Sequence, residues 1–436
     1  MTDATQDPQE TDPAAQTDPA ARDIPGGPPK DGRARRPRII VHTGKGGVGK
    51  TSVAAATALL AAERGYRTIV ISTDAAHSLA DVFDRPLGPE PVPVAPNLWA
   101  QESDIYYNVE TYWGTIQAYI ARLFQWRGLD EVMAEELAVL PGMDEVANLL
   151  WIAEHHDRGL YDVIVVDAAP TGETLRLLAL PEALRWWMEK VYPPARQVAR
   201  LTGPLVSRIV GMPMPEDPFY SAAEDLFRRV DHVRGLLSDP DLTSIRVVLN
   251  LEKMVIKEAQ RSFTYVHLYG FPTDLVICNR VLPPDVGGYL TTWEASQRGY
   301  RPMVEEAFAP VPLRDAPFFE QEVVGLEMLR RLGAAVFGTD DPTLVYHRGR
   351  PYVVGRDGPD IVLSLELPFV ARDEVELLRF GDELVLQVGA WRRNLVLPRL
   401  LADVPASQAG LDDHTLRIRF PAPPPRNRSA ARRTGR

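Results

Sequence analysis

Apolar runs alternate with helix-forming segments from residue 38 onwards. The run RIIVHTG is followed by SVAAATALLAAERGY, a segment that favours a helix ending near Gly65. Four later runs also have strand character: RTIVISTD, YDVIVVDAAPTG, SIRVVLN and DLVICNRV. Strands that are apolar throughout and alternate with helices are typical of a parallel sheet covered on both faces. The pattern therefore predicts an α/β fold whose ligands bind beyond the carboxyl ends of the strands.

Two long segments between these strands have helical spacing of apolar residues, at about 108–158 and about 182–235. Pro193 and Pro194 should interrupt the second segment. Its large apolar side chains either cover the sheet or line an exposed groove, and the pattern leaves both interpretations open. These side chains are Trp186, Trp187, Met188, Val191, Leu205, Ile209, Met212 and Met214.

The pattern changes after GLEMLRRLG, residues 325–333. Residues 343–420 contain short runs with alternating polarity, such as Ile361, Leu363 and Leu365, separated by turns rich in Gly, Asp and Pro. This alternation predicts a separate all-β sandwich. The chain should therefore divide into a disordered tail at 1–36, an α/β domain with a helical subdomain at 37–338, a β-sandwich at 339–421 and a basic disordered tail at 422–436.

Composition narrows the class of protein. The formal net charge of -11 argues against nucleic acid as the main partner. The single cysteine, Cys278, excludes an internal disulfide framework and fits a reducing compartment. The chain has no apolar run of the length that a membrane-spanning helix requires. We therefore expect a soluble cytoplasmic protein.

The segment GKGGVGKT, residues 44–51, follows an expected strand and opens an expected helix. It satisfies the phosphate-loop pattern G-x-x-x-x-G-K-[ST]. Glycines allow backbone N–H groups to surround phosphate oxygens, and a helix N-terminus adds partial positive charge. Lys50 is expected to reach the β- and γ-phosphates of ATP, and the Thr51 hydroxyl to ligate Mg²⁺. The nucleotide-binding residues expected here are Gly44, Lys45, Gly46, Gly47, Val48, Gly49, Lys50, Thr51 and Ser52.

A second lysine, Lys45, follows the first glycine of this loop. The loop resembles the deviant phosphate loop of dimeric NTPases, which include the nitrogenase iron protein, the Min and Par ATPases and the arsenite-pump ATPase. The resemblance implies a P-loop NTPase fold and a homodimer in which Lys45 reaches the partner's nucleotide. There it would neutralise charge that develops during phosphoryl transfer. A solvated surface lysine is the alternative.

The segment STDAAHSLADVF, residues 72–83, resembles the first switch of the arsenite-pump and tail-anchored-protein-targeting ATPases, written D-P-A-H-S. Ala75 replaces the usual proline. The resemblance implies that Asp74 is catalytic, because it would orient and polarise the attacking water. His77 would either contact this site or act as a capping residue.

The segment VIVVDAAPTGETLRLL, residues 163–178, resembles the second switch, D-T-A-P-T-G-H-T-L-R. The resemblance implies that Asp167 holds Mg²⁺ or its waters and that the loop at Gly172 moves in response to the γ-phosphate. Ala168 and Glu173 depart from the family pattern, which leaves the details of coupling open.

Three further segments resemble nucleotide-contacting parts of the same family. Glu252, within LNLEKMVIKEAQRS, would contact nucleotide across the dimer, although a solvent-facing helix glutamate is the alternative. Asn279 ends a strand, and its amide can both donate to and accept from adenine. Pro317 and Phe318 would pack near the base.

The resemblance covers about residues 38–335 and bears on the partners. Eukaryotic targeting ATPases bind a shared zinc through a C-x-x-C pair, but residues 281–300 contain no cysteine, so we expect no zinc. In those relatives the helical segments form a groove for a transmembrane helix. The β region, with LSLELPFVARDEVELLRFGDELVLQVG, resembles the α-crystallin domain of small heat-shock proteins. It either handles protein clients or is a structural appendage.

These resemblances favour a Mg²⁺-dependent homodimeric ATPase that binds hydrophobic or transmembrane segments of client proteins and delivers them peripherally to a membrane. One alternative is a partition or positioning ATPase of the Min/Par type, which the acidic charge disfavours. Another is a metalloid-efflux ATPase, which the single cysteine disfavours.

Overall fold

The computed structural model describes residues 36–73, 78–102, 113–137, 143–168, 217–349, 352–380, 383–389, 391–397 and 404–421. Asp74, His77, Gly172, Glu173 and the apolar residues between 186 and 214 lie outside these ranges.

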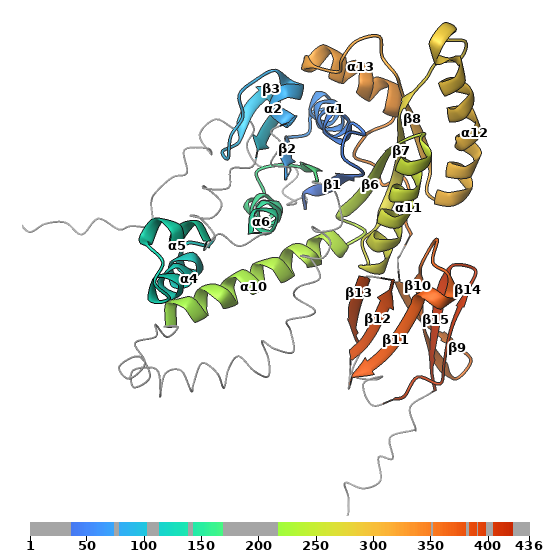
Figure 1. Cartoon of the computed structure of the whole chain (residues 1–436). Helices are drawn as coiled ribbons and strands as arrows, with labels where there is room; N and C mark the ends of the chain where they lie inside the picture. Colours follow the sequence, from blue (N-terminus) through green and yellow to red (C-terminus); the bar gives the residue numbers. More distant parts are fainter. Residues whose placement is uncertain are drawn as a thin grey trace, which may run out of the picture. The chain divides into compact units, whose positions relative to one another are not determined.

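The α/β part is built on an eight-stranded sheet in the order β3-β4-β2-β5-β1-β6-β7-β8 (Figure 1). All neighbouring pairs are parallel except β3 and β4. The strands are β1 (Arg38–Thr43), β2 (Thr68–Ser72), β3 (Val92–Ala95), β4 (Leu98–Glu102), β5 (Val163–Asp167), β6 (Thr243–Asn250), β7 (Thr273–Val281) and β8 (Leu313–Pro317). The five apolar runs expected as strands are β1, β2, β5, β6 and β7. Strands β3, β4 and β8 were not anticipated from the pattern.

The central strands are buried along their whole length, which requires cover on both faces. Helices α1 and α13 pack together against the sheet, and so do α6 and α10. The helices of this part are α1 (Lys50–Glu63), α2 (Ser78–Phe83), α4 (Gly114–Trp126), α5 (Glu131–Leu137), α6 (Met143–Arg158), α10 (Asp217–Ser238), α11 (Lys253–Leu268), α12 (Thr291–Phe308) and α13 (Gly325–Phe337). Within 113–137 and 143–158, the described parts of the expected helical segment 108–158, the chain forms three separate helices, α4, α5 and α6.

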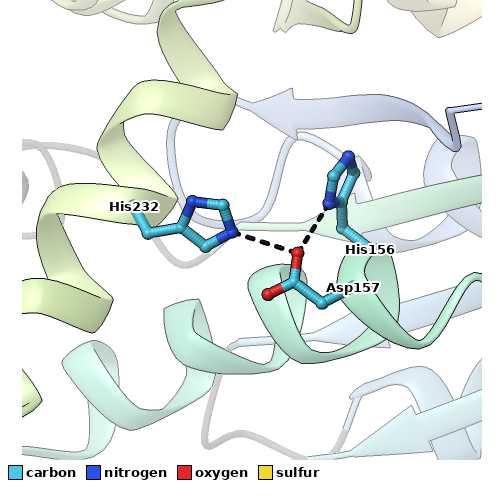
Figure 2. Close-up of side chains that lie close together, drawn as sticks. All are labelled: His156, Asp157 and His232. Carbon is cyan, nitrogen blue, oxygen red and sulfur yellow. Dashed lines mark hydrogen bonds and ion pairs between the residues drawn. The ribbon is translucent and has the colours of Figure 1, made fainter.

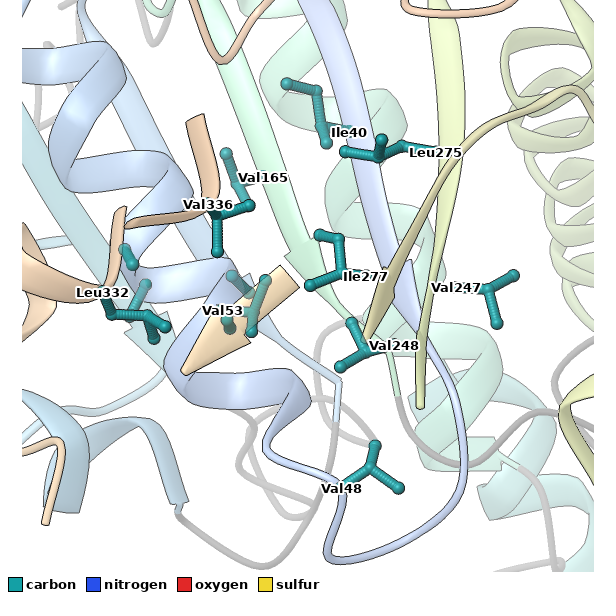
Figure 3. Packing of buried hydrophobic residues seen from close by; sticks show 14 of the residues in the cluster. Ile40, Val48, Val53, Val165, Val247, Val248, Leu275, Ile277, Leu332 and Val336 are labelled. Atoms are coloured by element: carbon teal, nitrogen blue, oxygen red, sulfur yellow. The ribbon is translucent and has the colours of Figure 1, made fainter. Parts of the chain in front are cut away.

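The main hydrophobic core joins the sheet to its helices. Figure 3 shows strand residues such as Val165 and Ile277 beside Val53 of α1 and Leu332 of α13. Gly333 brings α13 close to α1, because a Cβ at this position would lie 1.8 Å from Cδ1 of Leu60. This packing fixes the position of α1 and therefore of the loop that precedes it.

A buried ion pair between β6 and β7 holds the segment after α13 against the sheet. Nε of Arg246 lies 3.3 Å from Oδ1 of Asp274, and both side chains are almost fully buried. Arg246 also donates to the carbonyl of Pro342 at 2.8 Å, and the backbone N–H of Tyr346 donates to Asp274. Breaking such a pair would leave a buried charge unpaired, so it holds residues 342–346 in place.

The C-terminal part is all β, as expected. It contains a four-stranded sheet in the order β14-β15-β10-β9 and a three-stranded sheet in the order β11-β12-β13, both antiparallel. The strands are β9 (Tyr352–Asp357), β10 (Asp360–Glu366), β11 (Val375–Phe380), β12 (Glu383–Val388), β13 (Trp391–Val396), β14 (Gln408–Asp412) and β15 (Thr415–Phe420). The alternating residues Ile361, Leu363 and Leu365 lie in its core.

Candidate functional site

The loop between β1 and α1 has the backbone conformation that phosphate binding requires. Gly44, Gly47 and Gly49 have φ angles of 152°, 81° and 89°, which residues with a side chain rarely adopt. A Cβ on Gly44 would lie 2.1 Å from the carbonyl oxygen of Val248, and one on Gly49 would lie 2.3 Å from Nδ2 of Asn279. The glycines therefore let the loop pass closely over the carboxyl ends of β6 and β7.

The two lysines of the loop have different surroundings. Lys50, the first residue of α1, is buried, and its Nζ donates to the carbonyl oxygen of Lys45 at 3.3 Å. Lys45 is half-buried, and its Nζ lies 3.0 Å from Oε2 of Glu258 on α11. Lys50 thus folds back over its own loop, whereas Lys45 points to an exposed face shared with α11.

Asp167 occupies the carboxyl end of β5 and is 1% exposed. It is in register with His42 of β1, immediately before the phosphate loop. Its carbonyl oxygen accepts from the backbone N–H of Thr73 at 3.0 Å, which joins the end of β2 to the end of β5. The sheet thus brings the Asp167 carboxylate and the loop carrying the Thr51 hydroxyl to one edge. Both are hard oxygen donors, so this donor set fits Mg²⁺.

Residues 74–77 lie outside the described residues, but both of their flanks are held by side chains. The carbonyl oxygen of Thr73 accepts from Nδ2 of Asn148 at 3.2 Å. Oε1 of Glu102 accepts from the backbone N–H groups of Leu79 and Ala80 at 2.9 and 3.2 Å, and so caps the N-terminus of α2. Neither Asn148 nor Glu102 belongs to a recognisable motif, and their role was not anticipated.

The role of His42, a buried histidine just before the loop, was also not predicted from the sequence. Thr57 on α1 donates its hydroxyl to the carbonyl of Val53 at 2.7 Å, so the same oxygen accepts from Nε2 of His42 at 3.2 Å. Burial, and then the charge of Arg246, lower the pKa of His42 well below its usual range. The imidazole is therefore neutral and serves as a donor that ties β1 to α1. The sequence feature that could have indicated this role is the presence of a polar residue inside the apolar run RIIVHTG.

A cavity of about 710 Å³ adjoins the loop on the side of β7 and β8. Its lining brings together five residues expected at the nucleotide from three segments of the chain, which are Gly49, Ser52, Asn279, Pro317 and Phe318. Asn279 is buried, and its Nδ2 donates to the carbonyl oxygen of Val48 at 2.7 Å. Its amide nitrogen therefore holds the phosphate loop, a contact that the sequence did not indicate.

Glu252 does not line this cavity. It is the exposed residue that precedes α11, directly after the loop that follows β6. Met254, two residues later, is 74% exposed. Met254 therefore lies on the same helix as Glu258, the ion-pair partner of Lys45, and Glu252 immediately precedes that helix.

No helix among the described ranges combines the length and apolar character needed to span a membrane.

Comparison with known proteins agrees with this geometry. A family model described as anion-transporting ATPase matches residues 37–338, and one described as an HSP20-like domain found in ArsA matches residues 358–420. A protein of Aquifex aeolicus named as an arsenical pump-driving ATPase is 37% identical over 392 residues, 87% of this chain and 99% of the relative. A protein of Chlorobaculum tepidum with a similar name is 39% identical over 387 residues, 88% of this chain and 96% of the relative.

A more distant relative is named ATPase get3, from Aspergillus terreus. It is 29% identical over 305 residues, which are 67% of this chain and 88% of the relative. The family model covers the whole segment from β1 to α13, including the loop, the Asp167 strand and the Asn279 cavity. The chain therefore belongs to the anion-transporting ATPase family, as an ATPase with a C-terminal HSP20-like domain.

Proposed function

We propose that this ATPase works as a Mg²⁺-dependent homodimer whose nucleotide state controls the binding of a hydrophobic polypeptide client. Residues 37–338 would hydrolyse ATP, and residues 339–421 would form the HSP20-like module. The dimer proposal rests on Lys45, which is half-buried and is directed to Glu258 of α11 rather than to its own phosphate loop. The proposal of a hydrophobic client rests on a group of exposed apolar side chains on α4 and α5.

The nucleotide would bind with its phosphates in the loop and its base in the adjoining cavity. Lys50 would release the Lys45 carbonyl and turn to the phosphates. Asn279 would keep the loop in place through Val48 and leave Oδ1 for the adenine amino group. Thr51 and Asp167 would hold Mg²⁺, which neutralises phosphate charge when bound. Asp74 would orient the attacking water.

Lys45 supports the dimer because it is poorly placed to act within its own subunit. Its Nζ is directed to Glu258 on an exposed face, and the ion pair is exposed enough to be weak. The same helix carries the exposed Met254, and the exposed Glu252 immediately precedes it. A second copy of the chain docking on this face would cover Met254 and bring Lys45 and Glu252 to the partner's nucleotide.

The client proposal rests on α4 and α5. Trp126, Val132, Met133 and Leu137 expose 38%, 68%, 49% and 50% of their surfaces. Exposed groups of large apolar residues are uncommon unless they bind something, and methionine adapts to varied partners. The apolar residues between 186 and 214, which the sequence also offers as a lining for a groove, lie outside the described residues. The kinship with a protein named ATPase get3 supports a client of the tail-anchored class.

The decisive experiment measures binding of a tail-anchored segment to the full chain with ATP, with ADP and without nucleotide. Affinity should depend on nucleotide, and light scattering should show a dimer with ATP. Val132→Ser together with Met133→Ser should weaken client binding without changing basal ATP hydrolysis. Equal client affinity in all nucleotide states would sink the client proposal.

Asp74→Asn separates binding from chemistry. An amide of the same shape cannot accept the proton of the attacking water, so ATP affinity should persist while hydrolysis is lost. Retained hydrolysis in this variant would refute the role of Asp74. The measurement is single-turnover hydrolysis alongside ATP titration.

A second candidate, metalloid-stimulated hydrolysis, is favoured by the names of the relatives. The single cysteine of this chain is poorly placed to bind a metalloid. Cys278 is fully buried in β7, and burial raises the pKa of its thiol to about 12. Arsenite that accelerates hydrolysis would favour this candidate. A gel shift with DNA at low salt would in turn favour a partition ATPase.

A further inference from the structure

Two histidines and an aspartate meet where α6 and α10 pack together (Figure 2). His156 and Asp157 lie in the last turn of α6, and His232 projects from α10. Nδ1 of His156 lies 3.0 Å from Oδ1 of Asp157, and Nε2 of His232 lies 3.1 Å from the same oxygen. The ATPase site described above uses none of these three residues.

We propose that His156, Asp157 and His232 form a binding site for a divalent transition-metal ion, with Zn²⁺ as the best fit. Two imidazole nitrogens and one carboxylate oxygen are ligands that Zn²⁺ accepts in tetrahedral sites. The three ligands leave one position for water. This site differs in kind from the cysteine zinc that the sequence excluded between subunits, because it lies within one chain.

The spacing suits an ion of this size. The three candidate ligand atoms all lie within 4.8 Å of one another. Ligands at about 2.0–2.2 Å from a tetrahedral Zn²⁺ are separated by about 3.4 Å. The two contacts with Asp157 are already slightly shorter than that, so small side-chain rotations would bring all three atoms onto one ion. Nε2 of His156 is buried, so Nδ1 is the nitrogen that this residue offers.

The local charge favours a cation. His156 and Asp157 lie in the last turn of α6, where the carbonyl groups of the helix end carry partial negative charge. Two of the nearby cations on these helices are paired, Arg158 with Glu154 at 2.9 Å and Arg228 with Asp225. The carboxylate is therefore available as an anionic ligand.

The site is also open to solvent. The side chains of Asp157 and His232 are 57% and 46% exposed, so an ion can enter without unfolding either helix. Helix α6 leads into β5, whose last residue is Asp167, and α10 leads into β6. A bound ion would therefore fasten together two helices that precede β5 and β6, the strands on either side of β1 in the catalytic sheet.

The test is calorimetric titration of the full chain, without a histidine tag, with ZnCl2 near neutral pH in millimolar MgCl2. Magnesium prefers oxygen ligands and should not compete at two imidazoles. We expect one Zn²⁺ per chain and a rise in Tm on its addition. His232→Ala and Asp157→Asn should each weaken Zn²⁺ affinity by at least about tenfold and abolish the rise in Tm.

The matched control is His414→Asn, which removes an exposed histidine elsewhere on the chain. Asn tolerates the positive φ of 60° at this position, so the variant should fold and bind Zn²⁺ like the wild type. Circular dichroism of the zinc-free proteins checks that α6 and α10 are intact in each variant. Zn²⁺ affinity that is equal in the wild type and His232→Ala, or absent from the wild type, would overturn the proposal and leave the cluster as a hydrogen-bonded clamp.

Discussion

Lys45 and Glu258 form an ion pair in which Nζ and Oε2 are 3.0 Å apart, on the exposed face that the phosphate loop shares with α11. Exposed pairs of this kind contribute about 1 kcal/mol or less, so Lys45 can leave Glu258 at little cost when a partner approaches. The buried Lys50 has no comparable freedom.

Lys45→Ala should therefore reduce turnover far more than nucleotide binding. We expect hydrolysis to fall by about a hundredfold, the scale associated with losing one group that stabilises developing charge. ATP affinity should change little, whereas Lys50→Ala should abolish it. Glu258→Gln is the control, because it removes the ion pair and keeps Lys45. Turnover and ATP affinity that fall together in Lys45→Ala would contradict the cross-dimer role.

Asn279→Ala tests whether the Asn279 side chain on β7 holds the phosphate loop in its conformation. It leaves the Val48 carbonyl without its 2.7 Å hydrogen bond in a buried position. A cost of about 1–1.5 kcal/mol corresponds to roughly a tenfold loss of ATP affinity. Gln321→Ala changes an exposed residue of the same cavity and should leave affinity intact. Titration calorimetry compares the two, and equal affinities would show that the loop holds its shape unaided.

Glu102→Ala tests the anchoring of the segment after residue 77. It removes the acceptor of the Leu79 and Ala80 N–H groups and should cost about 1–3 kcal/mol of local stability. Because Asp74 lies just before α2, we expect hydrolysis to fall while ATP affinity is kept. Glu90→Ala, on the exposed turn before β3, serves as the control. Hydrogen exchange at residues 78–83 should accelerate only in Glu102→Ala.

Buried histidines predict how stability depends on pH. Burial lowers the pKa values of His155 and His267 to about 4 and that of His42 well below its usual range. Below about pH 6.5 the unfolded chain binds protons that the folded chain cannot, so the free energy of unfolding falls as pH falls. The loss for His155 should reach about 3 kcal/mol near pH 4 and should be complete below that pKa.

Urea unfolding between pH 7 and pH 4 measures this slope. His155→Gln removes one of the three groups and should flatten the slope, because glutamine does not titrate. His414→Asn replaces an exposed histidine and should leave the slope unchanged. A slope that is the same in His155→Gln and in the wild type would show that His155 does not contribute to acid unfolding.

The sequence by itself determined the fold class, the order of the central strands along the chain and the phosphate loop. These features are local. Apolar runs predict strands wherever they occur, and Gly44, Gly49 and Lys50 lie within one short motif. The edge strands β3 and β8 were missed because they are short and contain proline and polar residues.

Tertiary structure alone decided which distant residues support the site. The contacts of Glu102 with α2, of Asn279 with Val48 and of His42 with Thr57 each join segments that the parallel sheet brings together. The cluster of His156, Asp157 and His232 also arises only where α6 and α10 pack. A sequence shows which side chains are polar. The direction of a single donor or acceptor depends on packing across the whole sheet, and no local pattern encodes it.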